Sequence, residues 1–372
     1  MQMQQFFRPP LVEVHTADIH FGVMDAKKQY DILKEQMINV LAPVKFDAFF
    51  INGDLFDHKF YLNSDVTYYV LRFIDDVVQL CMKNNATLVV LHGTYSHDAK
   101  QFQLFSRYSQ CVDIRIVEHI DFQYIKGTTV LCIPEEYNKD PAYYMNKLLE
   151  RDYDMVVLHG AIKGAIYGMD KVDFNGKTPV FGLESFRRCY GPIICGHVHV
   201  AKCFENHIYY CGSPIRWKFG EEQAKGFLIC TYNPNTYQYY MHFQVIESFR
   251  YDTINLTNML AFEPIVVIEH IKKLKEKGID YIKIKFDTAC PTTDLIKKHF
   301  STSRDIKIDV ADAKFAETIQ RNQENVDDMD KYAYMLNPNA KPEEIFVQYV
   351  NQCMGECYIT VEELTKILNE GI

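Results

Sequence analysis

Short apolar runs recur along the chain, and each of them ends in Asp, His or both. The first run, Leu11–Val14, leads into Asp18 and His20, which lie two residues apart. Side chains repeat with a period of two along a strand, so this Asp and this His project to the same side of the strand end. The later runs end in the same way, at Asp54, at His97 and Asp98, at His159, and at His197 and His199.

The recurrence of this pattern predicts a fold class and a metal site. Short apolar runs bounded by polar loops are typical of buried strands. Residues 24–42 and 64–84 instead repeat their apolar side chains at helical spacing, so we expect helices there. Strands that alternate with helices indicate an α/β domain. Ligands of such sheets collect at the carboxyl ends of the strands, where Asp and His suit divalent transition metals.

The order of the motifs resembles that of the calcineurin-like metallophosphoesterases. The motifs are Asp-x-His at 18–20, Gly-Asp-x-x-Asp at 53–57, a loop from Gly to His-Asp at 93–98, His-Gly at 159–160 and Gly-His-x-His at 196–199. A further segment, Gly212-Ser213-Pro214, is similar to one in the SbcD-type nucleases. These are the nuclease partners of SMC-like ATPases in double-strand-break repair, and bacteriophage recombination nucleases belong to the group. The motifs cover residues 15–199, and the resemblance extends to about residue 230.

The resemblance implies two packed mixed β-sheets flanked by helices, followed by a small α/β capping domain and a C-terminal helical segment. We expect a metallophosphoesterase nuclease domain at 1–248, a capping, DNA-binding domain at 249–312, a linker at 313–340 and an ATPase-docking segment at 341–372. In the capping region we expect helices at 262–277 and 291–300 and strands at 281–286 and 305–310. The last segment carries two short amphipathic helices, which are too small to form a core alone. The alternative to docking is an ordinary terminal hairpin.

The resemblance also implies roles for the motif residues. Asp18, His20 and His199 would hold a first metal ion, Asp54 would bridge, and His159 and His197 would hold a second ion. We expect two Mn²⁺ ions, with Mg²⁺, Fe or Zn²⁺ as alternatives, because mixed His and carboxylate ligands fit Mn²⁺, Fe or Zn²⁺ best. His97 would face the scissile phosphate, where it stabilises charge or protonates the leaving oxygen. Asp98 either orients His97 or caps the loop.

The loop from Gly93 to Asp98 departs from the family pattern. The family has Gly-Asn-His-Asp, whose Asn carbonyl binds the second metal, whereas this loop is two residues longer and has no Asn. Ser96 stands in the place of the Asn relative to His97. A hydroxyl is a weaker neutral ligand than an amide oxygen. With Ser96 as the ligand, the second site would bind its metal loosely or through water.

Composition limits the partners. The formal charge is −9, so contacts with DNA must come from local basic residues and bound cations. The candidates are Arg187, Arg188, Arg216 and Lys218, which would touch phosphates without reading sequence. Eleven scattered Cys without a Cys-x-x-Cys pair indicate reduced thiols. The first ten residues lack a signal pattern, and no apolar run approaches the ~20 residues that span a bilayer. We therefore expect a cytoplasmic protein, in the host cytoplasm if its source is a phage, without membrane association.

Taken with the resemblance, these features predict a Mn²⁺-dependent DNA exonuclease and endonuclease. It would process double- and single-stranded DNA ends as a homodimer with an SMC-like, SbcC-type ATPase. Two alternatives stay open: a phosphoesterase of the same superfamily that acts on a small phosphodiester or phosphomonoester, and a DNA-end-binding scaffold whose catalysis has lapsed. The complete set of motif ligands argues against the scaffold, and the Gly212-Ser213-Pro214 segment argues against the small substrate.

Overall fold

The chain is described by a computed structural model that covers residues 7–137, 139, 141–165, 179–256, 263–286, 291–303 and 305–310. Its contacts divide it into two compact units. One unit comprises Met1–Asp252 with Gly278–Tyr281, and the other comprises Thr253–Lys277 with Ile282–Ile372. The expected linker and ATPase-docking segment lie outside the described residues.

The first unit contains two six-stranded mixed sheets. The first sheet has the order β14-β13-β1-β2-β3-β4, from strands β1 (Leu11–Thr16), β2 (Ala48–Asn52), β3 (Thr87–Leu91), β4 (Ile114–Val117), β13 (Lys225–Asn233) and β14 (Gln238–Ile246). The second has the order β11-β12-β10-β7-β6-β5, from β5 (Asp121–Ile125), β6 (Thr128–Ile133), β7 (Met155–His159), β10 (Ile193–Gly196), β11 (Lys202–Phe204) and β12 (Ile208–Tyr210). A short pair, β8 (Ala161–Ile162) and β9 (Val180–Phe181), stands apart. The predicted fold class is therefore confirmed.

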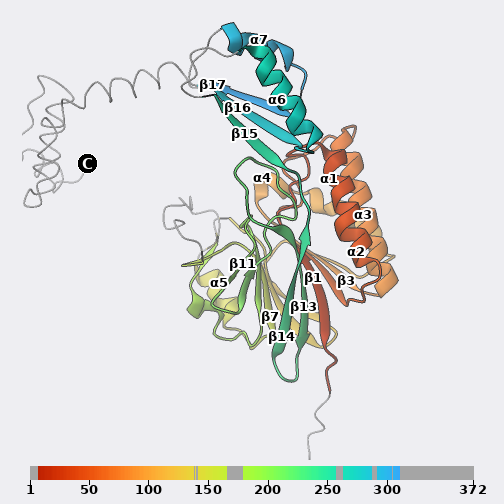
Figure 1. Cartoon of the computed structure of the whole chain (residues 1–372). Helices are drawn as coiled ribbons and strands as arrows, with labels where there is room; N and C mark the ends of the chain where they lie inside the picture. Colours follow the sequence, from red (N-terminus) through yellow and green to blue (C-terminus); the bar gives the residue numbers. More distant parts are fainter. Residues whose placement is uncertain are drawn as a thin grey trace, which may run out of the picture. The chain divides into compact units, whose positions relative to one another are not determined.

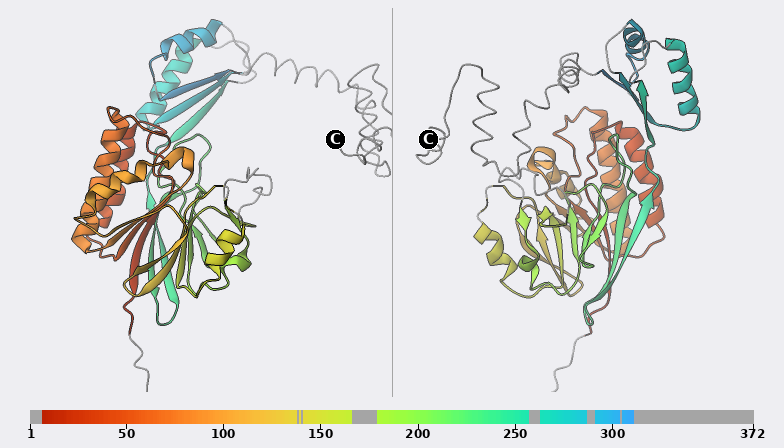
Figure 2. Two further views of the ribbon diagram at one scale, coloured as in Figure 1. Left: turned by 180° about the vertical axis from the view of Figure 1, so that it is seen from behind. Right: turned by 60° about the vertical axis from the view of Figure 1, so that its left-hand side comes forward.

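Helices cover the outer face of each sheet. α1 (Ala26–Leu33), a π-helical turn (Lys34–Ile38), α2 (Asn39–Leu41) and α3 (Asp65–Asn84) lie against the first sheet (Figure 1; Figure 2 shows the same arrangement from two further sides). The second sheet is covered by α5 (Pro141–Leu148) and a 3₁₀ turn (Leu183–Phe186). The loop after β3 contains α4 (Tyr95–Asp98) and a 3₁₀ segment (Gln101–Tyr108). Both helices expected from periodicity are thus confirmed, the first with a π-helical turn inside it.

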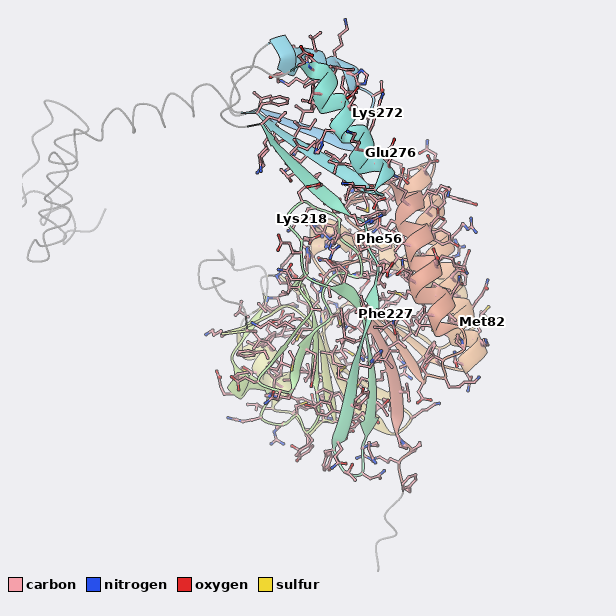
Figure 3. All side chains as sticks on the ribbon, viewed as in Figure 1. Phe56, Met82, Lys218, Phe227, Lys272 and Glu276 are labelled. Carbon is pink, nitrogen blue, oxygen red and sulfur yellow. The ribbon has the colours of Figure 1, made fainter. Side chains whose placement is uncertain are left out.

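Local chemistry explains the bounds of the longest helix, α3. The Ser64 hydroxyl accepts a hydrogen bond from the Thr67 amide (3.2 Å), which satisfies one donor of the first turn. Asn85 ends the helix in the left-handed conformation (φ 50°) that favours Asn and Gly. Between these caps the apolar side chains fall on one buried face. Figure 3 shows the opposite, exposed side of the helix at Met82.

Alternation along the strands separates two apolar cores. On β2, Phe49 and Ile51 face the helices, whereas Phe50 points between the two sheets. The core between the sheets also takes Val89 from the first sheet and Val157 from the second. Burying a large apolar side chain stabilises the fold by about 1.5–3 kcal/mol, so both faces of β2 hold it in place. The packing on both faces therefore fixes the position of Asp54, which follows the carboxyl end of β2.

The second unit has a three-stranded sheet, β15-β16-β17. It consists of β15 (Tyr251–Leu256), β16 (Tyr281–Phe286) and β17 (Ile306–Val310), with helices α6 (Pro264–Glu276) and α7 (Pro291–His299). Ile282, Ile284 and Phe286 alternate on the buried face of β16, and Lys272 and Glu276 lie on α6 (Figure 3). The helices and strands expected at 262–310 are confirmed as elements. Across the described residues, no helix is long and apolar enough to cross a membrane.

Candidate metal centre

The carboxyl ends of strands from both sheets deliver the predicted metal ligands to one place. Asp18 and His20 follow β1, Asp54 follows β2, His97 lies in α4 after β3, His159 ends β7, and His197 and His199 follow β10. Four overlapping sets of three residues could each hold a metal ion, because within each set one ligand atom per residue lies within 4.8 Å of the others. The sets are Asp18, His20 and His199; His20, Asp54 and His97; Asp18, Asp54 and His159; and Glu135, His159 and His197. The structure thus brings all six strongly predicted ligands together, and His97 with them.

The first half of the centre consists of Asp18, His20 and His199. The Nε2 atoms of the two histidines lie 3.2 Å apart, and His199 Nε2 is 3.8 Å from Asp18 Oδ1. Behind His20, Nδ1 lies 3.7 Å from an oxygen of Asp57. No hydrogen bond forms at that distance, and the ring presents Nε2 to the centre.

Asp54 lies between the two halves. Its Oδ2 atom is 3.7 Å from His20 Nε2, 3.3 Å from His97 Nδ1 and 3.5 Å from His159 Nε2. The other oxygen, Oδ1, accepts a hydrogen bond from the Thr94 amide (2.6 Å). Burial alone would raise the pKa of Asp54, but the surrounding imidazoles, His159 foremost, hold it well below its ordinary value. Asp54 therefore has the position and charge of a bridging ligand.

The second half consists of His159, His197 and Glu135. His159 is fully buried, and its Nδ1 donates a hydrogen bond to the backbone oxygen of Asn52 (2.7 Å). Nε2 is therefore the nitrogen that faces the centre, and it has no hydrogen-bond partner among the described residues. A buried nitrogen in that state is suited to a metal ion. Glu135 Oε2 lies 3.3 Å from His197 Nδ1 and 3.6 Å from His159 Nε2.

The backbone around these ligands is strained. Asp18, His20, Asp54 and His197 all have positive φ, at 51°, 49°, 52° and 80°. Side chains disfavour this region, at a cost of roughly 1–3 kcal/mol per residue, and such strain clusters at functional sites. Gly53 lies beside them at φ 89°, and a Cβ there would meet the His159 ring at 2.2 Å. The sheets approach so closely at this end that a side chain at 53 would displace a ligand.

The electrostatics fit two divalent cations. Burial, foremost, lowers the pKa of His20 to about 4 and that of His199 to about 3, so both rings are neutral and able to ligate. Burial also raises the pKa of Asp18 to about 7, although His159 and His197 partly offset this effect. Asp18 Oδ2 is buried without a hydrogen-bond partner among the described residues. Buried carboxylates are costly unless a cation compensates them, and bound metal ions would supply that charge.

The loop after β3 places its polar residues differently from one another. Asp98 is fully buried and accepts hydrogen bonds from the amides of Asp54 (2.9 Å), Gly93 (2.8 Å) and Phe56 (3.2 Å). This geometry matches the loop-cap alternative for Asp98, and the His97 ring faces Asp54 instead. Ser96 is exposed. The hydroxyl that reaches the centre belongs to Thr94, 3.1 Å from Asp54 Oδ2.

Sequence reasoning missed three contributors. Glu135 follows β6 as the other ligands follow their strands, and the apolar run Val130–Ile133 before it carried that signal. The sequence around Thr94 and Trp217 gives no comparable signal. The Trp217 ring lies 5.4 Å from that of His20 and 4.9 Å from that of His199, measured between ring centres.

The loop that carries Trp217 is anchored by a buried lysine. Lys225 Nζ donates to the His199 carbonyl (2.9 Å) and the Ser213 hydroxyl (2.7 Å), and forms an ion pair with Glu221 (3.1 Å). The second oxygen of Glu221 accepts a hydrogen bond from the Trp217 amide (3.0 Å). One network therefore ties the Gly212-Ser213-Pro214 segment to a predicted metal ligand.

The predicted DNA-contacting residues fall in two places. Lys218 is exposed, and its amine lies over the Trp217 ring (4.9 Å to the centre), near the metal centre (Figure 3). The Arg216 guanidinium instead donates to the backbone oxygen of Glu222 (3.3 Å). Arg188 forms an ion pair with Asp152 (2.8 Å), and Arg187 is its neighbour. Both precede β10 and so lie toward its amino end, whereas the metal centre lies at the carboxyl end. The structure does not bring Arg187 and Arg188 to the site.

A cavity of about 700 Å³ opens beside Glu135. Its walls include the aromatic rings of His92, Tyr95 and Tyr137. Tyr137 accepts a hydrogen bond from the Tyr95 amide (3.0 Å), which ties this wall to the loop of His97. The centre therefore borders a space large enough for part of a substrate.

Comparison with known proteins agrees with this site. The family model of the calcineurin-like phosphoesterases matches residues 14–201, and the chain belongs to this family. Members of the family are phosphoester hydrolases with two bound metal ions, and the ligand clusters described above correspond to that centre. No curated protein matches the chain.

Among solved structures, the chain is similar to an archaeal phosphodiesterase, at 12% identity over 63% of this chain and all of that one, with a TM-score of 0.30. It is also similar to a cold-active protein-tyrosine phosphatase of a Shewanella species, at 14% identity over 62% of this chain and 80% of that one, with a TM-score of 0.29. A protein of unknown function from Aquifex aeolicus matches at 13% identity over 62% of this chain and 95% of that one, with a TM-score of 0.23. These likenesses identify neither a substrate nor a partner.

Proposed function

We propose that this phosphoesterase is a Mn²⁺-dependent DNA nuclease of the SbcD type, which processes DNA ends together with an SMC-like, SbcC-type ATPase. The observation that carries the hydrolytic part is the convergence of Asp18, His20, Asp54 and three further imidazoles at the strand ends, with His97 beside them. Two divalent ions held there would supply a hydroxide nucleophile and charge relief for phosphodiester cleavage.

The side chains of the centre divide the remaining work. Asp54 contributes an oxygen to both halves and sets their spacing. His97 is partly exposed, with Nδ1 3.3 Å from Asp54, so its ring is held while its other edge is available to a substrate oxygen. In that position it would protonate the leaving oxygen or stabilise phosphate charge, which contributes about 10²–10⁴-fold. Asp98 holds the loop after β3 against the loop after β2 through the amides of Gly93, Asp54 and Phe56.

The segment around Trp217 supports a nucleic acid as the substrate. It follows Gly212-Ser213-Pro214 and presents one indole and the Lys218 amine beside the ligands His20 and His199. Nucleic-acid sites combine such cations, which meet phosphates, with aromatic rings, on which bases stack. The cavity beside Glu135 offers room for a nucleoside next to the reacting phosphate. These features favour DNA over a small phosphomonoester.

Cleavage of linear double- and single-stranded DNA in Mn²⁺ tests the proposal. The same preparation is assayed on p-nitrophenyl phosphate and bis(p-nitrophenyl) phosphate, and a His199→Ala variant controls for contaminating nucleases. We expect the native chain to degrade DNA in the presence of Mn²⁺ and the His199→Ala variant to leave it intact. Turnover of the small esters without cleavage of either DNA would favour the small-substrate alternative. DNA binding without hydrolysis of any ester would favour the scaffold with lapsed catalysis.

The partner is a separate part of the proposal. Residues 249–312 are proposed to act as a capping domain and residues 341–372 to dock on the ATPase, because the two amphipathic helices predicted in the tail cannot form a core alone. Truncation after about residue 335 should keep Mn²⁺-dependent cleavage of simple substrates and strongly weaken co-purification with the ATPase. Unchanged association of the truncated chain would place the partner site elsewhere. The expected homodimer is tested on the same preparations by light scattering.

A further inference from the structure

Glu135 is delivered to the metal centre by the same device as the predicted ligands. It follows β6 by two residues, and β6 pairs in parallel with β7, which ends in His159. Its amide donates to the His92 carbonyl (3.0 Å), which fixes the turn against the loop of the first sheet. Three strands that neighbour one another in the second sheet, β6, β7 and β10, thus release Glu135, His159 and His197 at one edge.

The carboxylate lies on the side of His159 that faces the centre. His159 Nδ1 is occupied by the Asn52 carbonyl, so a metal ion can meet only Nε2. Glu135 Oε2 lies 3.6 Å from that Nε2, and the bridging candidate Asp54 lies 3.5 Å from it. A carboxylate that merely orients a ligating histidine contacts the nitrogen that points away from the metal. Glu135 contacts the opposite nitrogen and therefore occupies the position of a ligand.

The surroundings of Glu135 also fit a ligand. Its side chain is 1% exposed, and the same oxygen, Oε2, is 3.3 Å from His197 Nδ1. The Thr94 hydroxyl donates to it at 3.4 Å. A buried carboxylate is costly unless positive charge compensates it. A divalent cation within reach of His159, His197 and Asp54 would provide that charge.

We propose that Glu135 ligates the second metal ion of this centre. The proposal rests on the two-metal function proposed above and deepens it. The oxygen ligand that the loop from Gly93 to Asp98 lacks is then supplied from a different strand. Each half of the centre acquires the same donors, since Asp18, His20 and His199 form one half, Glu135, His159 and His197 form the other, and Asp54 is shared.

This assignment changes the expected strength of the second site. Ser96 as a neutral hydroxyl ligand predicted a loosely held ion. A carboxylate adds a full negative charge and a hard oxygen, which strengthens binding of Mn²⁺. The ion at the second half should therefore be retained about as well as the ion at the first half.

Metal binding to the full chain tests the assignment without relying on catalysis. The metal-free protein is titrated with Mn²⁺, bound Mn²⁺ is counted after gel filtration, and electron paramagnetic resonance distinguishes a coupled pair from a single ion. Glu135→Gln keeps the shape and removes the charge. Its second ion should be held at least about 10–100-fold more weakly, with bound Mn²⁺ falling from two per chain to about one and the coupled signal lost.

Two internal controls make the result specific. Glu136→Gln changes the neighbouring carboxylate, which contacts His119 (2.8 Å) and the Ile120 amide (2.9 Å), and it should keep both ions. Trp217 is the only tryptophan of the chain and lies against His20 and His199, so quenching of its fluorescence by Mn²⁺ reports chiefly the first half. This quenching should persist in Glu135→Gln and show that the variant is folded.

The outcomes separate the ligand from the function. Two tightly bound ions in Glu135→Gln would overturn the assignment and leave the two-metal function standing. Fewer than two ions in the native chain would overturn both. Equal losses in Glu135→Gln and Glu136→Gln would also overturn the assignment, because the effect would then be one of local charge. Loss of one ion in Glu135→Gln alone, with Trp217 quenching preserved, is the result that we expect.

Discussion

The two sheets of the first unit contribute to the metal centre in different ways. The first sheet releases Asp18, His20 and Asp54 through turns in which all three residues have positive φ. The second sheet supplies His159 from a regular strand end, and among its ligands only His197 has positive φ. The first sheet thus holds its ligands by strained backbone, and the second holds His159 by a hydrogen bond to the first, at the Asn52 carbonyl.

This difference teaches where the centre is vulnerable. Contacts between the sheets set the geometry of both halves: the His197 amide donates to Asp18 (3.0 Å), and Asn52 accepts from His159 (2.7 Å). A change at the junction should therefore damage both halves, whereas a change away from it should damage neither. The following substitutions test that contrast.

Substitution of Asp54 should have the largest effect, because its carboxylate lies within 3.7 Å of imidazoles from both sheets. We expect Asp54→Asn to reduce Mn²⁺-dependent cleavage by about 10⁴-fold or more, since each lost 1.36 kcal/mol of transition-state stabilisation costs a factor of ten. Cleavage is measured together with bound Mn²⁺. A folded variant that cleaves at the native rate would show that Asp54 does not bridge the two halves of the metal centre.

His97→Ala should rank second. His97 comes from the first sheet and touches Asp54, but it is proposed to act on the substrate rather than to hold a metal. Cleavage should fall about 10²–10⁴-fold while both ions and DNA binding are retained. His58→Ala serves as the control, because His58 is exposed and contacts Asp57 rather than Asp54. If bound Mn²⁺ falls in His97→Ala, then His97 is a ligand and the proposed role is wrong.

Gly53→Ala probes the close approach of the sheets. The added methyl meets the His159 ring at 2.2 Å, and Ala also tolerates φ 89° poorly. Gly220→Ala is a matched control, because Gly220 has the same φ of 89° and nothing within 4 Å of its Cβ position. Gly53→Ala should lower the free energy of unfolding by about 1–3 kcal/mol more than the control and weaken Mn²⁺ binding. If urea unfolding shows the same loss of stability in both variants, then the backbone φ and not the contact with His159 causes the destabilisation.

Substitutions of basic residues should have the smallest effects, and only one of the two should change DNA binding. Lys218→Ala, near Trp217, should weaken DNA binding a few-fold and make it less dependent on salt, because one phosphate contact is lost. Arg188→Ala should leave DNA binding unchanged, because Arg188 lies toward the amino end of β10 and pairs with Asp152. Filter binding at two salt concentrations measures both. A larger loss in Arg188→Ala would restore it as a DNA contact and place the path of DNA over the other end of the second sheet.

Much of the fold was predictable because the motif ligands follow apolar runs, and an apolar run reveals a strand and its direction. Glu135 follows such a run too, but no family motif marks it, so attention stayed on Ser96. Closeness in sequence to His197 suggested that Arg187 and Arg188 lie near the metal centre. Strand β10 lies between these arginines and His197 and carries the chain from one end of the second sheet to the other. The positive φ of Asp18, His20 and Asp54 could not be predicted, since no glycine signals it.

The order of the first sheet has a consequence for the biosynthesis of the protein. β1, which releases Asp18 and His20, lies between β2 and β13, and β13 begins only at Lys225. While the chain is emerging from the ribosome, β1 therefore has one open edge until most of the first unit has been made. Open edges of apolar strands invite pairing with other chains. His197 and His199 are also made late, so the nascent amino-terminal half carries neither complete half of the centre. The centre is therefore complete only after the segment that follows β10 has been synthesised.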